Sequence, residues 1–269
     1  MARPHAEIAV VGGSGFYSWL EDPVEVLPDT PYGTPSAAIR VGAVGGRAVA
    51  FLPRHGDSHE WPPHRVNYRA NLWALRGLGV RRVIGPSAVG SLRSDLVPGE
   101  LVVLDQLVDR TSGRADTYLD GPDVGHVSFA DPYFPELGEV LAAAGEAAGA
   151  RVRRGGAVVV IQGPRFSTRA ESAWFRSQGW DVVNMTQYPE AYLARELGLC
   201  YAGLALVTDF DTGVEGDESV EAVTHEAVLE VLAATVATTR EVLARAVPAV
   251  PEEPGCACRR LGWPGLTSP

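Results

Sequence analysis

The sequence predicts a single α/β domain with a central mixed β-sheet flanked by helices. Short apolar stretches typical of buried strands alternate with amphipathic helical stretches along most of the chain. Residues 36–43 and 48–53 are separated by a turn at Gly45-Gly46, which predicts a hairpin and therefore a sheet that is not purely parallel. The 269 residues suit one domain, and 46% hydrophobic residues allow a substantial core.

The remaining elements follow in order along the chain. Strands are predicted at residues 6–12, 82–84, 100–107, 157–161, 181–184 and 201–208. Helices are predicted at residues 65–76, 137–148, 189–198 and 224–246, and after Arg165, where Thr168 and Glu171 have the spacing of a capping box. The domain is predicted to cover residues 1–247, followed by an irregular tail, residues 248–269, that contains Pro and Cys.

Composition excludes several classes of function. The net charge of −10 argues against a general affinity for nucleic acid or an anionic membrane. All 23 basic residues are arginine, so Schiff-base chemistry and lysine-dependent phosphate loops are excluded, and a bound anion must be held by arginine, hydroxyls or backbone N–H groups. No apolar run reaches the ~20 residues that span a bilayer, and the N-terminus lacks the apolar core of a secretory signal, so we expect a cytoplasmic protein.

The spacing of potential metal ligands predicts no metal site. The three cysteines, Cys200, Cys256 and Cys258, do not have a zinc-site spacing, and the six histidines form no HExxH pair.

Three predicted strands end in groups suited to an anion. These are Gly12-Gly13-Ser14-Gly15, Arg54-His55-Gly56 and Ser87-Ala88-Val89-Gly90. Each taken alone has a simpler explanation, such as a tight turn or a solvated arginine. Ligands of open α/β sheets bind at the carboxyl ends of strands, however, so the coincidence of the three predicts an anion site.

Two further segments each allow a purely structural and a functional interpretation. Val183-Asn184-Met185-Thr186 is either core or a flat apolar contact for a sugar, with the Thr186 hydroxyl on phosphate. Asp209 and Asp211 end an apolar strand and form either a turn or a buried acid that protonates a leaving base.

The motifs IAVVGGSGF, DTPYG, RHG, VNYRANLWAL, SAVGSL, DQLVDRT, GPRFSTRAES, VVNMT, LARELGLCYA and VTDFDTG occur in this order. With them the chain resembles the trimeric purine nucleoside phosphorylases, and within these the 5′-methylthioadenosine phosphorylases, over about residues 6–246. The resemblance implies a homotrimer with its active site at a subunit interface. It also implies inorganic phosphate as co-substrate, with no metal or organic cofactor.

Site residues can be carried over from the resemblance where the motifs match. The phosphate-binding residues would be Ser14, Arg54, His55, Ser87, Ala88 and Thr186. The nucleoside-binding residues would be Phe166, Val183, Asn184, Met185, Asp209, Asp211, His59 and, from a neighbouring subunit, His126 of the long irregular stretch 111–135. Asp209 and Asp211 would be the catalytic residues facing the purine.

The predicted reaction converts 5′-methylthioadenosine and phosphate to adenine and 5-methylthioribose 1-phosphate. Alternatives are a phosphorylase for inosine or guanosine, one for a 5′-halo-5′-deoxyadenosine, and a nucleotide-binding regulatory domain. Gln187 and Tyr188 depart from the family, where smaller residues are usual. The short acidic segment after Asp211, TGVEGDESV, lies where the 5′-substituent should be covered.

The cysteines allow two interpretations. A cytosolic protein is expected to keep three free thiols. Heat-stable relatives in the family carry a similar C-terminal CxC, and this resemblance implies instead that a tail cysteine pairs with Cys200 or that Cys256 pairs with Cys258.

Overall fold

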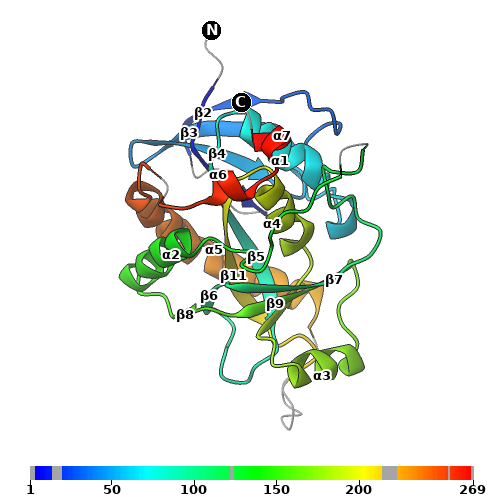
Figure 1. Ribbon diagram of the computed structural model, residues 1–269. Helices are drawn as coiled ribbons and strands as arrows, with labels where there is room; N and C mark the ends of the chain where they lie inside the picture. Colours follow the sequence, from blue (N-terminus) through cyan, green and yellow to red (C-terminus); the bar gives the residue numbers. More distant parts are fainter. Residues whose placement is uncertain (1–3, 14–19, 122–123, 214–222, 254, 268–269) are drawn as a thin grey trace.

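A computed structural model gives the fold, and it describes residues 4–13, 20–121, 124–213, 223–253 and 255–267. It shows one α/β domain around a twisted mixed sheet, as the sequence predicts (Figure 1). Within these residues no helix is both long and apolar enough to cross a bilayer.

Eleven strands are described in one sheet. Eight form the path β2-β3-β4-β1-β5-β10-β9-β7, while β11 pairs with β5 and β6, and β6 pairs with β8. Their bounds are β1 Ile8–Gly12, β2 Glu21–Val26, β3 Ile39–Val44, β4 Arg47–Pro53, β5 Arg82–Ser91, β6 Leu101–Val103, β7 Gln106–Arg110, β8 Val152–Arg154, β9 Ala157–Ile161, β10 Val182–Asn184 and β11 Cys200–Asp209. The predicted hairpin is confirmed as the antiparallel pair β3–β4.

Helices cover both faces of the sheet. They are α1 Tyr68–Gly77, α2 Pro135–Ala147, α3 Arg169–Ser177, α4 Gln187–Glu196, α5 His225–Ala249, α6 Cys258–Leu261 and α7 Pro264–Thr267, with a 3₁₀ turn at Pro63–Arg65. Strand β1 shows why both faces need cover, because its side chains alternate between two cores. Ala9 and Val11 pack with α1 and α4, whereas Ile8 and Val10 pack with α2 and α5.

Strand β5 changes partners along its length, and this opens the space for a site. Its first residues pair with β1 only as far as Ile84, and its last residues pair antiparallel with β10. Throughout it pairs with β11. Beyond Ile84 the carboxyl ends of β1 and β4 therefore separate from the second half of β5.

Several predicted boundaries were wrong for reasons of tertiary context. The strand predicted at residues 82–84 continues to Ser91 through Gly85-Pro86, because β11 and β10 supply partners for it. The strand predicted at 100–107 is two strands, β6 and β7, which pair with different neighbours. Strands β2 and β8 were not predicted, since both are largely polar and lack a buried face.

The tail is more ordered than predicted. Helix α5 continues to Ala249, and the one-turn helices α6 and α7 follow. The tail folds back over the domain, where Cys258 is buried and the backbone N–H of Trp263 donates to the Glu196 carbonyl at 2.9 Å. In Figure 1 this return places α6 beside α4.

Candidate active site

A cavity of about 420 Å³ lies where β5 separates from β1 and β4. This volume is in the range of small-molecule sites. Twelve of the site residues predicted from the sequence line it: Arg54, His55, His59, Ser87, Ala88, Phe166, Val183, Asn184, Met185, Thr186, Asp209 and Asp211. They come from the segment after β4, the second half of β5, β10 and the residues after it, the end of β11 and the loop before α3, so the expected convergence of these strands brings them together.

The two carboxylates sit at a β-bulge. The register of β11 on β5 shifts between Val207 and Asp209, so that Asp209 pairs with Gly90. Bulges of this kind re-aim side chains. Gly90 permits the arrangement, because a Cβ there would lie 2.8 Å from Oδ1 of Asp209 and 3.1 Å from the Cβ of Asp211.

Asp209 is held by two short hydrogen bonds. The Thr208 hydroxyl donates to Oδ2 and the Asp211 backbone N–H donates to Oδ1, both at 2.7 Å. Asp211 is buried and has a φ of 54°, in the left-handed region that few side chains occupy. Backbone of this kind is concentrated at functional sites.

Burial dominates the electrostatics of both acids. Desolvation raises the pKa of Asp209, against the opposing effect of the two hydrogen bonds and with a further rise from the Asp211 charge. Desolvation also raises the pKa of Asp211, opposed by the hydroxyls of Ser172 and Ser167. Both groups therefore bind a proton more readily than an exposed aspartate.

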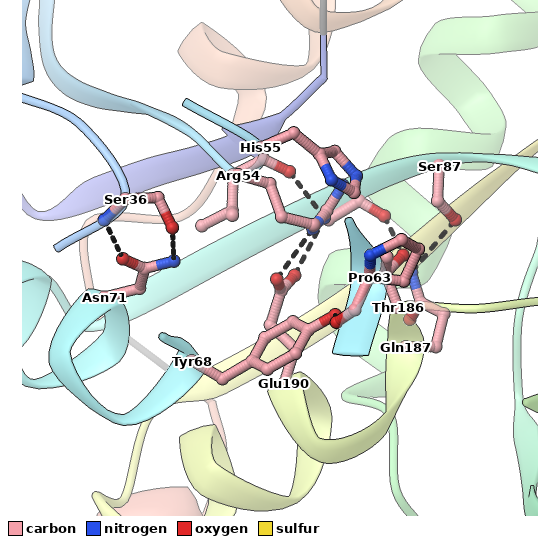
Figure 2. A network of polar contacts seen from close by, with 12 residues as sticks. Ser36, Arg54, His55, Pro63, Tyr68, Asn71, Ser87, Thr186, Gln187 and Glu190 are labelled. Carbon is pink, nitrogen blue, oxygen red and sulfur yellow. Dashed lines mark hydrogen bonds and ion pairs between the residues drawn. The ribbon is translucent and has the colours of Figure 1, made fainter. Parts of the chain in front are cut away.

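Among the described residues one arginine, Arg54, lines this cavity, and it is already engaged in an ion pair (Figure 2). Nε and Nη2 donate to the two carboxylate oxygens of Glu190 at 2.7 and 2.8 Å, Nη2 also donates to the Val11 carbonyl, and Nη1 donates to the Pro86 carbonyl. Four of the five N–H donors thus have protein acceptors, and one N–H of Nη1 is left for a ligand. Arg54 and Glu190 are both buried, so this is a rigid, internally neutralised pair.

His55 is neutral. Burial and, next, the Arg54 charge lower the pKa of His55 from 6.5 to about 4. Its Nδ1 lies 2.8 Å from the Trp61 carbonyl oxygen, and because a carbonyl only accepts, Nδ1 carries the ring hydrogen. Nε2 is then an acceptor.

The hydroxyl of Ser87 is set up as a donor (Figure 2). Its oxygen accepts from the amides of Asn184 and Gln187, each at 3.2 Å. Both lone pairs are thereby occupied, so the hydroxyl proton is what Ser87 has left to offer a ligand. The Thr186 hydroxyl also accepts from the Asn184 side-chain amide, at 3.4 Å, and the side-chain oxygen Oδ1 of Asn184 accepts from the backbone N–H groups of Thr186 and Gln187. One amide therefore orders two hydroxyls.

Comparison with known proteins places this site in a family. The model of the phosphorylase superfamily matches residues 7–248. The chain belongs to this superfamily. It is 54% identical, over 98% of both chains, to a purine nucleoside phosphorylase of Streptomyces coelicolor. It is 63% identical to an S-methyl-5′-thioadenosine phosphorylase of Mycolicibacterium smegmatis, over 80% of this chain and 82% of the relative.

A solved structure agrees with this placement. The methylthioadenosine phosphorylase of Schistosoma mansoni in complex with adenine matches with a TM-score of 0.86 and 39% identity, over 93% of both chains. The resemblance predicted from the motifs and the mixed-sheet fold are thus confirmed.

For the other two predicted residues of this phosphorylase the outcomes differ. Ser14 lies outside the described residues. His126 is exposed on the long loop and is absent from the cavity wall of its own chain. Its predicted place is against a neighbouring subunit, and this stays a prediction.

Sequence reasoning missed the residues behind the wall. Glu190 falls within the helix predicted at residues 189–198 and Gln187 stands out only as a departure from the family, so neither is predicted as part of the site. Gln187 instead donates to Ser87 and to the Gly85 carbonyl, and accepts from the Tyr133 hydroxyl. The signal that could have revealed them is an acidic and an amide side chain on a buried stretch that directly follows the VVNMT motif. Val228 and Leu229 of α5, also unpredicted, add apolar wall.

Proposed function

We propose that this phosphorylase cleaves 5′-substituted adenine nucleosides, 5′-methylthioadenosine first, with inorganic phosphate. The products would be adenine and 5-methylthioribose 1-phosphate. The observation that carries the proposal is that one cavity is lined both by two carboxyl groups with raised pKa values and by a cluster of hydrogen-bond donors, Arg54, Ser87 and Thr186. The named activities of the relatives support the same reaction.

The part of the cavity that contains Asp209 and Asp211 suits the leaving base. Adenine leaves readily only when N7 is protonated as the glycosidic bond breaks. Asp209, whose pKa is raised by burial, is the proposed donor of that proton, and Asp211 accepts from the 6-amino group. General-acid catalysis of this kind contributes about 10²–10⁴-fold.

The part of the cavity that contains the hydrogen-bond donors suits phosphate. The hydroxyls of Ser87 and Thr186 and the remaining N–H of Arg54 would donate to its oxygens, and Ser14 and the Ala88 backbone complete the proposed set. Nε2 of neutral His55 would accept from the O–H of monohydrogen phosphate. Phosphate held in this way attacks C1′ as the bond to the base breaks, so binding supplies the positional part of catalysis.

The nucleoside would lie between these two parts of the cavity. Met185 and Val183 would pack under the ribose, with Asn184 at the same wall, and Phe166 near the base. His59 would lie near the 5′ end, to which His126 of a neighbouring subunit would also reach. Val228 and Leu229 are apolar and suit a thioether better than a free hydroxyl.

The assembly and setting are proposed with the reaction. We place the enzyme in the cytoplasm as a homotrimer whose active site lies at a subunit interface. The chemistry transfers a ribosyl group to phosphate and involves neither electron transfer nor a carbonyl adduct, so it requires no organic cofactor.

A 6-oxopurine nucleoside is the second candidate substrate. It is favoured by the purine nucleoside phosphorylase name of the relative that matches this chain almost end to end. An ionised carboxylate would repel O6 of inosine, whereas it accepts from the 6-amino group of adenine. The two acidic groups of this base site therefore favour adenine.

Initial rates with a panel of nucleosides test the proposal. Methylthioadenosine, adenosine, inosine and a 5′-halo-5′-deoxyadenosine would be compared with and without phosphate. We expect phosphate-dependent release of free adenine, with kcat/KM for methylthioadenosine well above that for inosine. An equal or greater kcat/KM for inosine would contradict the specificity, and base release that ignores phosphate would contradict the reaction class.

A further inference from the structure

The three cysteines of the chain meet at one point, although 55 residues separate Cys200 from the tail pair in sequence. Their Sγ atoms all lie within 4.8 Å of one another, and those of Cys200 and Cys256 are 3.0 Å apart. All three are free thiols. The structure thus confirms that the tail folds back onto Cys200, but it shows none of the disulfides implied by the family resemblance.

Contacts other than sulfur hold the cluster in place. On one side, the Arg82 guanidinium donates to the Glu252 carbonyl at 2.9 Å, and the Gly255 N–H donates to the Glu136 carboxylate at 3.2 Å. On the other side, the Trp263 N–H donates to the Glu196 carbonyl. The sulfurs therefore converge because the tail is docked there.

The geometry fits a small soft ion between the sulfurs. A metal about 2.3 Å from each of three thiolates in a plane keeps the sulfurs about 4 Å apart. Side-chain rotations that move each sulfur by about an ångström would bring the cluster to this spacing. Cys200 and Cys258 are buried, whereas Cys256 is half-buried, so an ion could reach the cluster from solvent at Cys256. The Cys258 backbone N–H already points at the Cys256 sulfur at 3.4 Å, an outer hydrogen bond that would steady a thiolate ligand.

We propose that Cys200, Cys256 and Cys258 form a binding site for a soft, three-coordinate metal ion, for which Cu⁺ is the best match. Thiolates select soft ions such as Cu⁺ and Zn²⁺, but structural Zn²⁺ sites have four protein ligands. In the part of the chain that the structure describes, no His, Asp or Glu joins the three sulfurs. Binding replaces the thiol protons, which pass to solvent, and no electron is transferred.

The bound ion would fasten the tail to the domain. Cys200 is the first residue of β11 and Asp209 the last, so the cluster lies about 30 Å from the proposed acid. Loading the site should therefore raise thermal stability, because the ion binds only the folded arrangement, and should leave phosphorolysis unchanged.

A chelator competition tests the proposal. Full-length protein, reduced and freed of reductant under anaerobic conditions, is titrated with Cu⁺ held by a colour-forming Cu⁺ chelator, and in parallel with Zn²⁺ held by a zinc indicator. We expect each chain to withdraw one Cu⁺, to retain it more tightly than Zn²⁺, and to show three sulfur neighbours by X-ray absorption. Cys258→Ser and, separately, Cys256→Ser should weaken Cu⁺ binding by at least about 10–100-fold. Ala257→Ser keeps all three thiols and is the matched control.

Three results would overturn the proposal. One is the failure of reduced wild-type protein to take Cu⁺ from the chelator. Another is binding that survives in either cysteine variant, or a clear preference for Zn²⁺. The third is a count of one free thiol per denatured chain in the reduced preparation, because two of the sulfurs would then be joined covalently. Unchanged phosphorolysis shows that the variants are folded.

Discussion

At the scale of single residues, Asp209 and Asp211 share one strand end but have different surroundings. The Thr208 hydroxyl and the Asp211 backbone N–H donate hydrogen bonds to Asp209, and these fix the direction of its carboxyl group. Asp211 is less exposed to solvent and lies near the hydroxyls of Ser172 and Ser167. Different environments are how two like acids acquire different roles, and this favours Asp209 as proton donor and Asp211 as the group that recognises the base.

Replacing Asp209 by Asn should lower kcat about 10²–10⁴-fold, because an amide has no acidic proton for N7. The measurement is adenine release at saturating methylthioadenosine and phosphate. Asp29→Asn, at an exposed position away from the cavity, is the control and should behave as wild type. Near-normal turnover of the Asp209 variant would remove this residue from the acid role.

Replacing Asp211 by Asn should shift the ratio of kcat/KM values for methylthioadenosine and inosine toward inosine. An amide can donate to O6, whereas a carboxylate repels it. A loss of about 1–3 kcal/mol in discrimination, or roughly 5–150-fold in the ratio, is expected for one polar contact. If both activities fall together and their ratio stays constant, Asp211 does not select the base.

His55 should make folding stability depend on pH. Its folded pKa of about 4 lies below the ordinary value of 6.5, so between these values the unfolded chain binds more protons than the folded chain. Stability is therefore fully present above about pH 6.5 and falls as the pH drops toward 4. Melting temperatures across this range should fall less steeply for His55→Gln than for wild type, and parallel curves would exclude this contribution.

At the scale of elements, the start of α4 forms the back of the proposed phosphate site. Thr186 lines the cavity, Gln187 orders Ser87, and Glu190 holds Arg54. The φ and ψ of Tyr188 are not helical, so the helix proper begins at Pro189 and turns Glu190 toward β4. This single short segment therefore positions donors from two other strands.

Glu190→Gln should raise KM for phosphate at least about 10-fold, or ~1.4 kcal/mol, and change KM for the nucleoside much less. Glu190 is a positioning residue, because it contacts Arg54 and lines no part of the cavity. Loss of its charge leaves the buried guanidinium unpaired, which costs about 3–5 kcal/mol of stability.

Two further variants keep this prediction testable if Glu190→Gln folds poorly. Tyr201→Phe removes only the hydroxyl that donates to Glu190 at 2.7 Å and should give a smaller rise in the same KM. Glu241→Gln, on the exposed face of α5, should change neither constant. Equal rises in both KM values would indicate a general structural defect instead.

At the scale of the whole molecule, one chain supplies most of the proposed site. The cavity opens to solvent, and His126 is exposed although neighbouring residues of its long loop, such as Tyr118 and Ser128, hydrogen-bond to α4. A loop of this length is usually functional or contacts a partner. Completion of the site by a neighbouring subunit accounts for both features.

The protein should therefore sediment as a homotrimer, and His126→Ala should raise KM for methylthioadenosine while leaving KM for phosphate unchanged. Sedimentation and steady-state kinetics check the two parts. A His5→Ala variant, at the other end of the chain, is the matched histidine control. A fully active monomer in solution would refute the shared site.

The sequence by itself determined the fold class, the hairpin and about half of the described residues that line the cavity. These depend on short-range information, namely apolar periodicity and strand ends such as Arg54-His55 and Asp209-Phe210-Asp211. The carboxyl ends of neighbouring strands in an α/β sheet meet at one edge, so a local pattern was enough to predict that these groups converge. Long family motifs then supplied the chemistry that local patterns leave open.

Only the tertiary structure decided which partners these groups have. The length of β5 depends on β10 and β11, because a strand continues only where another strand satisfies its backbone. The pairing of Arg54 with Glu190 joins residues 136 positions apart, and the meeting of Cys200 with the tail joins residues 56 apart. No local pattern encodes such contacts, because they exist only once the burial of both cores has packed distant segments together.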